Sequence, residues 1–256
     1  MKKHYSEKVL SNELIAQNTY LLKITCEDEF LKWFRPGQFV HIQIPAANEL
    51  LLRRPISINY VDYEKRQVHI AYYVVGKGTR LLSQVRPGDI LDVLMPLGNG
   101  FSITSSMQKI WLVGGGIGNA PLKSMFSKYM DREYKAFLGF RCEDAVYQEA
   151  DFCEYAATCV TTDDGSYGGC GFCTDVLKEE LAKDTPDVIL ACGPMPLFKT
   201  LASIVGDIPT QVSMEQHMGC GTGGCATCVC GIGGENKRVC LEGPVFDIKE
   251  VDALYG

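Results

Sequence analysis

Short apolar runs alternate with turn residues over the first hundred positions of the chain. The runs are rich in β-branched and aromatic residues and partly alternate with polar ones, which is typical of strands. Gly37, Pro45 and the turn at residues 87–89 separate them. Short strands at this spacing predict an antiparallel β-barrel, with strands at residues 39–44, 56–62, 67–75 and 89–98.

From residue 109 onward, apolar strands alternate with segments of helical periodicity. Residues 109–130 predict a buried strand, a glycine turn and a helix. Strand and helix then continue to alternate, which predicts a parallel sheet with helices on both faces. The further strands are expected at 134–141, 157–162 and 187–192, and the further helices at 174–183 and 195–205.

Two changes of composition divide the chain. A polar link rich in Ser and Thr follows residue 101, and residues after 208 are rich in Gly and Cys. We therefore expect a multi-domain β plus α/β protein. Its parts are an antiparallel barrel over residues 1–101, an α/β domain over 102–208 and a small C-terminal module over 209–256.

Composition and charge exclude several classes. The chain has 256 residues, is 46% hydrophobic and carries a formal net charge of −6, which argues against a nucleic-acid partner or an anionic membrane surface. It has no run of 18 apolar residues, so no transmembrane helix is expected. The N-terminal stretch is typical of mature protein without a signal peptide. We expect a cytoplasmic protein whose twelve cysteines bind metal or remain thiols.

Four cysteines in the C-terminal module follow the spacing Cys-x4-Cys-x2-Cys-x11-Cys. This is the plant-type [2Fe–2S] pattern, and the surrounding glycines let backbone N–H groups approach the sulfurs. The expected metal ligands are Cys220, Cys225, Cys228 and Cys240. A zinc site that pairs Cys170-x2-Cys173 with Cys225-x2-Cys228 is the alternative, but it leaves Cys220 and Cys240 without a role.

The run LLRRPISI, at residues 51–58, leads two arginines into a strand. A guanidinium grips a diphosphate bidentately, and a serine shortly after it can bond a ring heteroatom. About twenty residues on, Gly76, Gly78 and Thr79 open a predicted helix, whose N-terminus favours anions. An arginine and a helix start on one barrel suit a dinucleotide such as FAD.

Two glycine turns follow strands of the α/β domain. LVGGGIGNAPL, at 112–122, departs from G-x-G-x-x-G because residue 119 is Asn, so a purely structural turn is the alternative. The second turn, residues 192–194, follows the strand expected at 187–192. We expect the two turns to flank one nicotinamide nucleotide, because ligands bind at the carboxyl ends of parallel strands. Arg141 beside Glu143 and Asp144 leaves NAD and NADP open. The candidates are Gly114, Gly115, Gly116, Gly118, Cys192, Gly193 and Pro194.

Other residues carry only structural expectations. The four histidines are isolated in sequence and are expected to be structural, and Met125 and Met130 are expected in the core. The run 163–165 ends a strand and either forms a turn or lines the nucleotide site.

The order of these motifs resembles the ferredoxin–NADP reductase superfamily over residues 5–208. The resemblance implies FAD on the first domain and NAD(P) on the second. The family's Arg-x-Tyr-Ser/Thr motif matches residues 54–57 with Ile in place of Tyr, so Tyr72 or Tyr73 is expected to cover the flavin instead. The implied FAD contacts are Arg54, Pro55, Ile56, Ser57, Ala71, Tyr72, Tyr73, Gly78 and Thr79.

With the cysteine run added, the whole chain resembles the family of electron-transfer subunits of dihydroorotate dehydrogenase B. That resemblance implies FAD, a [2Fe–2S] cluster and NAD⁺ as acceptor. It also implies an FMN-containing dihydroorotate dehydrogenase subunit as partner, in a heterotetramer with two of each chain. The implied role is electron transfer from dihydroorotate, through that FMN, to NAD⁺ in pyrimidine biosynthesis.

A flavin takes up two electrons as hydride, whereas an iron–sulfur cluster passes one, so a chain with both is expected to be a relay. We identify no third site with a placed acid–base group, and no catalytic residue for an organic substrate is predicted. The nearest rival is the reductase subunit of a sulfide- or polysulfide-reducing hydrogenase or of a ferredoxin-dependent transhydrogenase. Two more distant rivals are a zinc-stabilised binding module and a stand-alone reductase.

Overall fold

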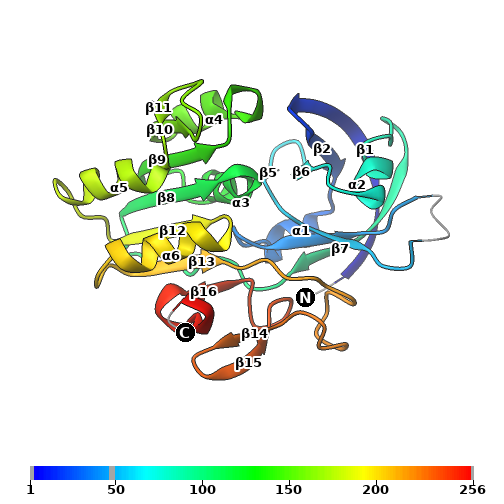
Figure 1. The fold of residues 1–256 in the computed structure, drawn as a ribbon. Helices are drawn as coiled ribbons and strands as arrows, with labels where there is room; N and C mark the ends of the chain where they lie inside the picture. Colours follow the sequence, from blue (N-terminus) through cyan, green and yellow to red (C-terminus); the bar gives the residue numbers. More distant parts are fainter. Residues whose placement is uncertain (1–2, 46–49, 255–256) are drawn as a thin grey trace.

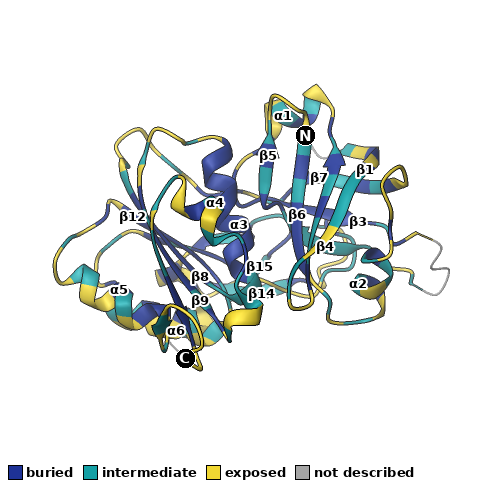
Figure 2. Ribbon diagram, turned by 90° about the horizontal axis from the view of Figure 1, so that it is seen from above, coloured by how far each residue is buried: buried dark blue, intermediate teal, exposed yellow. Residues whose placement is uncertain are grey.

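The computed structural model describes residues 3–45 and 50–254. Two seven-stranded sheets lie side by side, and the C-terminal hairpin packs below them in Figure 1. Seen from above, the buried residues concentrate in the strands of both sheets (Figure 2). None of the helices in the described ranges is both long and apolar enough to span a membrane.

The first sheet is antiparallel and has the strand order β4-β3-β7-β1-β2-β6-β5. Its outer strands β4 and β5 are joined by only two residues, so the two edges of the sheet meet and the sheet closes as expected for a barrel. Val40, Ile42 and Ile70 belong to its core. The strands are β1 (Lys3–Ala16), β2 (Thr19–Thr25), β3 (Phe39–Ile42), β4 (Arg54–Ser57), β5 (Tyr60–Asp62), β6 (Gln67–Tyr73) and β7 (Ile90–Leu97), with helices α1 (Asp28–Trp33) and α2 (Lys77–Leu82) between them.

The single strand predicted at 56–62 is two strands. The Ile58 amide bonds to the Gln38 carbonyl, whereas the next amide, of Asn59, bonds to the His69 carbonyl. The chain therefore changes partner strand at this corner, which a continuous apolar pattern does not reveal.

The second sheet has the order β11-β10-β9-β8-β12-β13-β16, parallel except for β16. Trp111 and Val113 face α5 and α6, whereas Ile110 and Leu112 face α3 and α4, so both faces are covered. The strands are β8 (Lys109–Gly115), β9 (Glu133–Phe140), β10 (Ala157–Thr162), β11 (Gly169–Cys170), β12 (Val188–Cys192), β13 (Thr210–Ser213) and β16 (Val245–Asp247). The helices are α3 (Asn119–Lys123), α4 (Glu149–Cys153), α5 (Cys173–Leu181) and α6 (Met195–Ile204), with the short turns η1 (Gly116–Gly118), η2 (Ser124–Ser127) and η3 (Glu143–Ala145).

The helix predicted up to residue 130 ends earlier, in η2. Met125 is fully buried, but Met130 is 64% exposed, so the expectation that Met130 lies in the core is wrong. The periodic segment is a short helix flanked by 3₁₀ turns, and Met130 lies beyond it.

The C-terminal part does not begin at residue 209 as a separate unit. β13 pairs with β12, and β16 returns to pair with β13, so the expected boundary divides the α/β sheet. β13 has only four residues, which is too short a pattern to be recognised as a strand. We propose instead a cysteine module at residues 214–244, closed at its base by the bond from the Met214 amide to the Pro244 carbonyl. It contains the hairpin β14 (Val229–Ile232) and β15 (Glu235–Arg238), and the turns η4 (Ile248–Glu250) and η5 (Asp252–Leu254) follow it.

Candidate functional site

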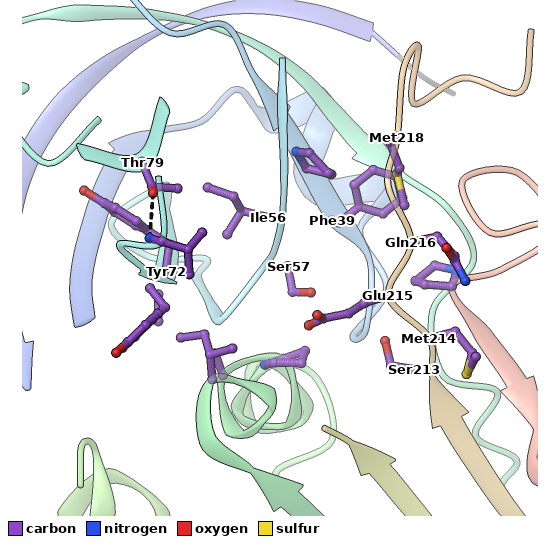
Figure 3. A pocket seen from close by; sticks show the side chains of 18 residues that line it. Phe39, Ile56, Ser57, Tyr72, Thr79, Ser213, Met214, Glu215, Gln216 and Met218 are labelled. Atoms are coloured by element: carbon purple, nitrogen blue, oxygen red, sulfur yellow. Dashed lines mark hydrogen bonds between the residues drawn. The ribbon is translucent and has the colours of Figure 1, made fainter. Parts of the chain in front are cut away.

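A first pocket opens where the barrel, the α/β domain and the cysteine module meet (Figure 3). Ser57 and Glu215 both point into it, from the barrel and from the module. The lining residues are Phe39, Pro55, Ile56, Ser57, Ala71, Tyr72, Tyr73, Val75 and Thr79 from the barrel, Ile117, Ala120 and Pro121 from the α/β domain, and Ser213, Met214, Glu215, Gln216, Met218 and Pro244 from the C-terminal part.

Arg54 does not line this pocket; its side chain lies against the first turn of α2. A Cβ atom on Gly78 would lie 2.4 Å from Arg54 Nε and 2.8 Å from Nη2, so only glycine leaves room for the guanidinium there. Thr79 Oγ1 accepts hydrogen bonds from the amides of Val75 (3.0 Å) and Gly76 (3.3 Å), which holds the turn. The guanidinium and the start of α2 therefore form one surface, as expected for residues that share a diphosphate.

The two tyrosines expected near a flavin differ in freedom. Tyr72 is 2% exposed, its ring stacks on Tyr20 at 5.8 Å, and its hydroxyl donates to Asn12 Oδ1 at 3.0 Å. Tyr73 is 39% exposed at the end of the same strand. Of the two rings, Tyr73 is the one free to adjust to a ligand.

A second pocket lies at the carboxyl ends of the parallel strands. Gly115 ends β8 and Gly116 follows it, Arg141 follows β9, Asp163 follows β10 and Pro194 comes shortly after β12. This edge is where ligands bind in open α/β sheets. The other lining residues are Gly139, Phe140, Phe172, Cys173, Thr174, Pro196, Leu197 and Thr200.

Four of the residues expected at the nucleotide do not line the second pocket: Gly114, Gly118, Cys192 and Gly193. A Cβ on Gly118 would lie 2.4 Å from the Cys192 carbonyl oxygen, and one on Gly114 would lie 2.0 Å from Asn119 Oδ1. Gly118 therefore lets the turn pack tightly on β12, and Gly114 leaves room for the side chain of Asn119. Asn119, which departs from the glycine pattern, donates to the Gly139 carbonyl at 3.3 Å and ties the turn to β9.

Cys192 is 1% exposed, so the expectation that it faces a ligand is corrected. Burial raises the pKa of its thiol, and the nearby charge of Glu215 adds to the effect. The thiol lies beneath the pocket wall as a neutral group.

The sequence alone did not identify Glu215 or Cys173 as pocket residues. Burial raises the pKa of the Glu215 carboxyl, although its side chain reaches the open pocket. Cys173 opens α5, and its Sγ donates to the Gly114 carbonyl at 3.5 Å, so the thiol is held by the α/β sheet. Glu215 could not be found from the sequence, since no local pattern shows which side chain enters a pocket between domains.

The four cysteines of the [2Fe–2S] pattern meet as two pairs. The Cys220 amide donates to Cys225 Sγ at 3.3 Å, and the Cys240 amide donates to Cys228 Sγ at 3.4 Å. The charge of Cys220 also raises the pKa of Cys240, so the pairs are neighbours. Within the described ranges, no three side chains of the metal-binding types already converge as one group.

Hydrogen-bond donors surround the more exposed pair, Cys220 and Cys225, which we call the outer pair. The amides of Thr222 (3.4 Å) and Gly224 (3.2 Å) point at Cys220 Sγ, and the Thr227 hydroxyl donates to Cys225 Sγ at 3.0 Å. Burial opposes ionisation of Cys220, but hydrogen bonds from Thr222 and Cys225 lower the pKa of its thiol to about 5. Burial raises the pKa of Cys240 to about 12.

These donors suit sulfur that carries negative charge. A [2Fe–2S] cluster takes four thiolates, two on each iron, and two neighbouring pairs supply that set. Amide donors to the sulfurs stabilise the anionic thiolates and tune a cluster's potential. The residues present therefore fit the cluster.

The alternative of a zinc site that pairs Cys170-x2-Cys173 with Cys225-x2-Cys228 is wrong. Cys170 lies in β11, at one edge of the α/β sheet, and the cysteine module lies beyond β13 and β16 at the other edge (Figure 1). Cys173 is buried against β8. The two Cys-x2-Cys motifs therefore cannot share one ion in this fold.

His41 links the barrel to the cysteine module. It is 0% exposed on β3, beside the backbone of Gly221. Burial, opposed by the neighbouring carbonyls of Arg53 and Cys220, lowers the pKa of the imidazole, so the ring is neutral at pH 7.

The barrel, the α/β domain and the cysteine module together have the ferredoxin–NADP reductase fold. They define the class of protein as a pyridine-nucleotide-linked electron-transfer reductase. The chain is similar to a chain of the NADH-dependent reduced ferredoxin–NADP oxidoreductase structure, with 31% identity and a TM-score of 0.82 over 98% of this chain and 91% of that one. Residues 215–252 match the iron–sulfur cluster binding domain of dihydroorotate dehydrogenase B.

Two curated relatives extend this likeness over nearly the whole chain. The dihydroorotate dehydrogenase B (NAD(+)) electron transfer subunit of Bacillus pumilus is 43% identical over 260 residues, covering 98% of both chains. That of Bacillus caldolyticus is 42% identical, covering 95% of this chain and 96% of the relative. The chain belongs to the family of dihydroorotate dehydrogenase B electron transfer subunits.

Proposed function

We propose that the chain relays electrons from the FMN of a dihydroorotate dehydrogenase subunit, through a [2Fe–2S] cluster and FAD, to NAD⁺, as part of pyrimidine biosynthesis. One observation carries the order of the relay. The end of β8 and the turn after it give Gly115 and Gly116 to the second pocket and Ile117 to the first. Met218 of the cysteine module also lines the first pocket, and it leads to Cys220 after a single residue.

The residues suit FAD in the first pocket. Arg54, Gly78 and Thr79 would hold its diphosphate, and Pro55, Ile56, Ser57, Ala71, Tyr72 and Tyr73 would line its ring. The close approach of Arg54 to Gly78 and the largely apolar pocket beside it support this assignment. Burial raises the pKa of the Glu215 carboxyl, and the side chains of Glu215 and Ser57 both enter the space assigned to the ring.

Gly115, Gly116 and Pro194 would hold the nicotinamide nucleotide in the second pocket, where Arg141 and Asp163 also lie. Gly114, Gly118, Cys192 and Gly193 would act from behind that wall by fixing the turn. NAD⁺ is the proposed acceptor because the relatives carry NAD(+) in their names.

Cys220, Cys225, Cys228 and Cys240 are the proposed cluster ligands. When bound, FAD exchanges two electrons with nicotinamide while the cluster passes one at a time, so this chain converts between the two modes. Its own residues bind and orient these groups, and the chemistry on dihydroorotate belongs to the partner subunit. We propose a cytoplasmic heterotetramer of two chains of each kind; the twelve free thiols suit a reducing compartment.

The test compares the chain alone with the reconstituted complex. The complex with its FMN subunit should reduce NAD⁺ with dihydroorotate, and the complex with the Cys225→Ser variant should not. The chain alone should oxidise NADH with artificial acceptors and show no activity with dihydroorotate. Dihydroorotate turnover by the chain alone, or full activity of the Cys225→Ser complex, would refute the relay.

A ferredoxin-linked transhydrogenase subunit is the second candidate, because of the similarity to the NADH-dependent reduced ferredoxin–NADP oxidoreductase structure. It predicts that the chain exchanges electrons with reduced ferredoxin and does not associate with the FMN subunit. Co-purification with the FMN subunit separates the two candidates.

A further inference from the structure

His41 lies on the outer face of the barrel. Val40 and Ile42 on either side of it belong to the barrel core, so the side chain of His41 points the other way. Phe39, two residues earlier, shares that outer face and lines the first pocket. Arg53 ties this strand to its neighbour β7, since its Nη1 donates to the His41 carbonyl at 3.5 Å and also to the Asp92 carbonyl at 3.0 Å and Asp92 Oδ1 at 2.5 Å.

The imidazole contacts the loop that carries the outer pair of cysteines. A Cβ on Gly221 would lie 2.4 Å from His41 Nδ1, and Gly221 has a φ of +69°. Both the close approach and the left-handed backbone favour glycine at this position. The loop therefore rests directly on the ring, one residue after Cys220.

Both ring nitrogens of His41 are buried without a hydrogen-bond partner among the described residues. The carbonyls of Arg53 and Cys220 are next to the ring, but neither satisfies hydrogen-bond geometry. A buried donor without a partner is costly and rarely retained. The Cys220 carbonyl is one of these two acceptors, and it belongs to the turn that carries the first of the four cysteines.

We propose that His41 is a positioning residue of the cluster site: it donates one ring N–H to the Cys220 carbonyl when the cluster is bound, and so fixes the outer cysteine pair against the strand that forms the flavin pocket. Nδ1 is the nitrogen nearest the loop. Phe39 and His41 then connect the two cofactor sites through one rigid strand. This inference rests on the proposed function, because it assigns a role toward the cluster.

The experiment uses the full chain with its cofactors. His41→Leu removes both nitrogens while filling the space, and His41→Asn keeps an amide donor near the position of Nδ1. His69→Leu is the matched control, because His69 is a partly buried histidine of the same barrel and its ring packs on Tyr60 of β5. For each variant we would measure the FAD content, the rate of iron release to a chelator, and the electron paramagnetic resonance (EPR) spectrum of the dithionite-reduced protein.

His41→Leu should keep its FAD, lose iron about fivefold faster and shift the EPR spectrum, a factor that matches the loss of one net hydrogen bond. His41→Asn should restore the wild-type rate and spectrum, and His69→Leu should leave both unchanged. A His41→Leu protein with the wild-type spectrum and iron release, or a His69→Leu protein with the same defects, overturns the inference alone. A wild-type chain that binds FAD but no iron overturns the proposed function, and the inference with it.

Discussion

A substitution at Gly78 tests the assignment of Arg54 to the FAD diphosphate. A Cβ added there would lie 2.4 Å from Arg54 Nε, 2.8 Å from Nη2 and 2.9 Å from Cζ. Gly78 lies inside the short helix α2, where alanine is a better helix former than glycine. Gly78→Ala should therefore leave the helix intact and displace only the Arg54 guanidinium.

The loss of the contact between Arg54 and the diphosphate sets the size of the expected loss of FAD affinity. A hydrogen bond to a charged group contributes roughly 1.5–3 kcal/mol, so the dissociation constant for FAD should rise about 10- to 150-fold. Arg54→Ala should have the same effect. The double variant should be no weaker than either single one, because both substitutions remove one interaction.

Flavin fluorescence during titration of the apoprotein measures this affinity. Gly76→Ala is the control, since a Cβ on Gly76 meets no atom within 4 Å and its backbone is extended. Wild-type affinity in Gly78→Ala, or additive losses in the double variant, would refute the assignment of Arg54 to the diphosphate.

Three further predictions concern other parts of the molecule. Cys225→Ser should abolish the long-wavelength absorption of the cluster while FAD stays bound; an unchanged visible spectrum would remove Cys225 from the ligand set. Gly118→Ala should lower thermal stability by about 1–3 kcal/mol, because its Cβ would meet the Cys192 carbonyl at 2.4 Å, and wild-type melting would contradict this packing. Burial raises the pKa of the Glu7 carboxyl above 4.5, although Thr25 donates a hydrogen bond to it. The contribution of this group to stability is therefore present below pH 4.5 and is lost as the pH rises through the pKa of the folded carboxyl. Glu7→Gln should therefore raise the melting temperature at pH 7 and leave it nearly unchanged at pH 4, and the opposite pH dependence would count against the buried charge.

Local patterns predicted the parts of this protein that are local in sequence. The spacing of the four cysteines lies within one short segment, and the strand–glycine–helix order around residue 115 is contiguous. Both patterns depend only on neighbouring residues, so they can be recognised without knowledge of the fold. The alternating barrel and α/β patterns likewise indicated the fold class.

The walls of the first pocket come from all three parts of the protein, from segments far apart in sequence, and no periodicity relates Ser57 to Glu215. For the same reason the sequence treated His41 as an ordinary structural histidine, since its contact with Gly221 joins residues 180 positions apart. Gly118 and Cys192 were misjudged because a glycine turn looks the same in sequence whether it faces a ligand or packs on a strand.

The central claim is that one chain connects nicotinamide to a cluster. Its most direct test is an anaerobic titration of the purified chain with NADH, followed by visible absorption and EPR, with iron, sulfide and flavin measured on the same sample. We expect iron and sulfide each at about twice the flavin, and a cluster signal that appears on addition of NADH alone. A chain with flavin but no iron, or a cluster that dithionite reduces and NADH does not, would contradict it.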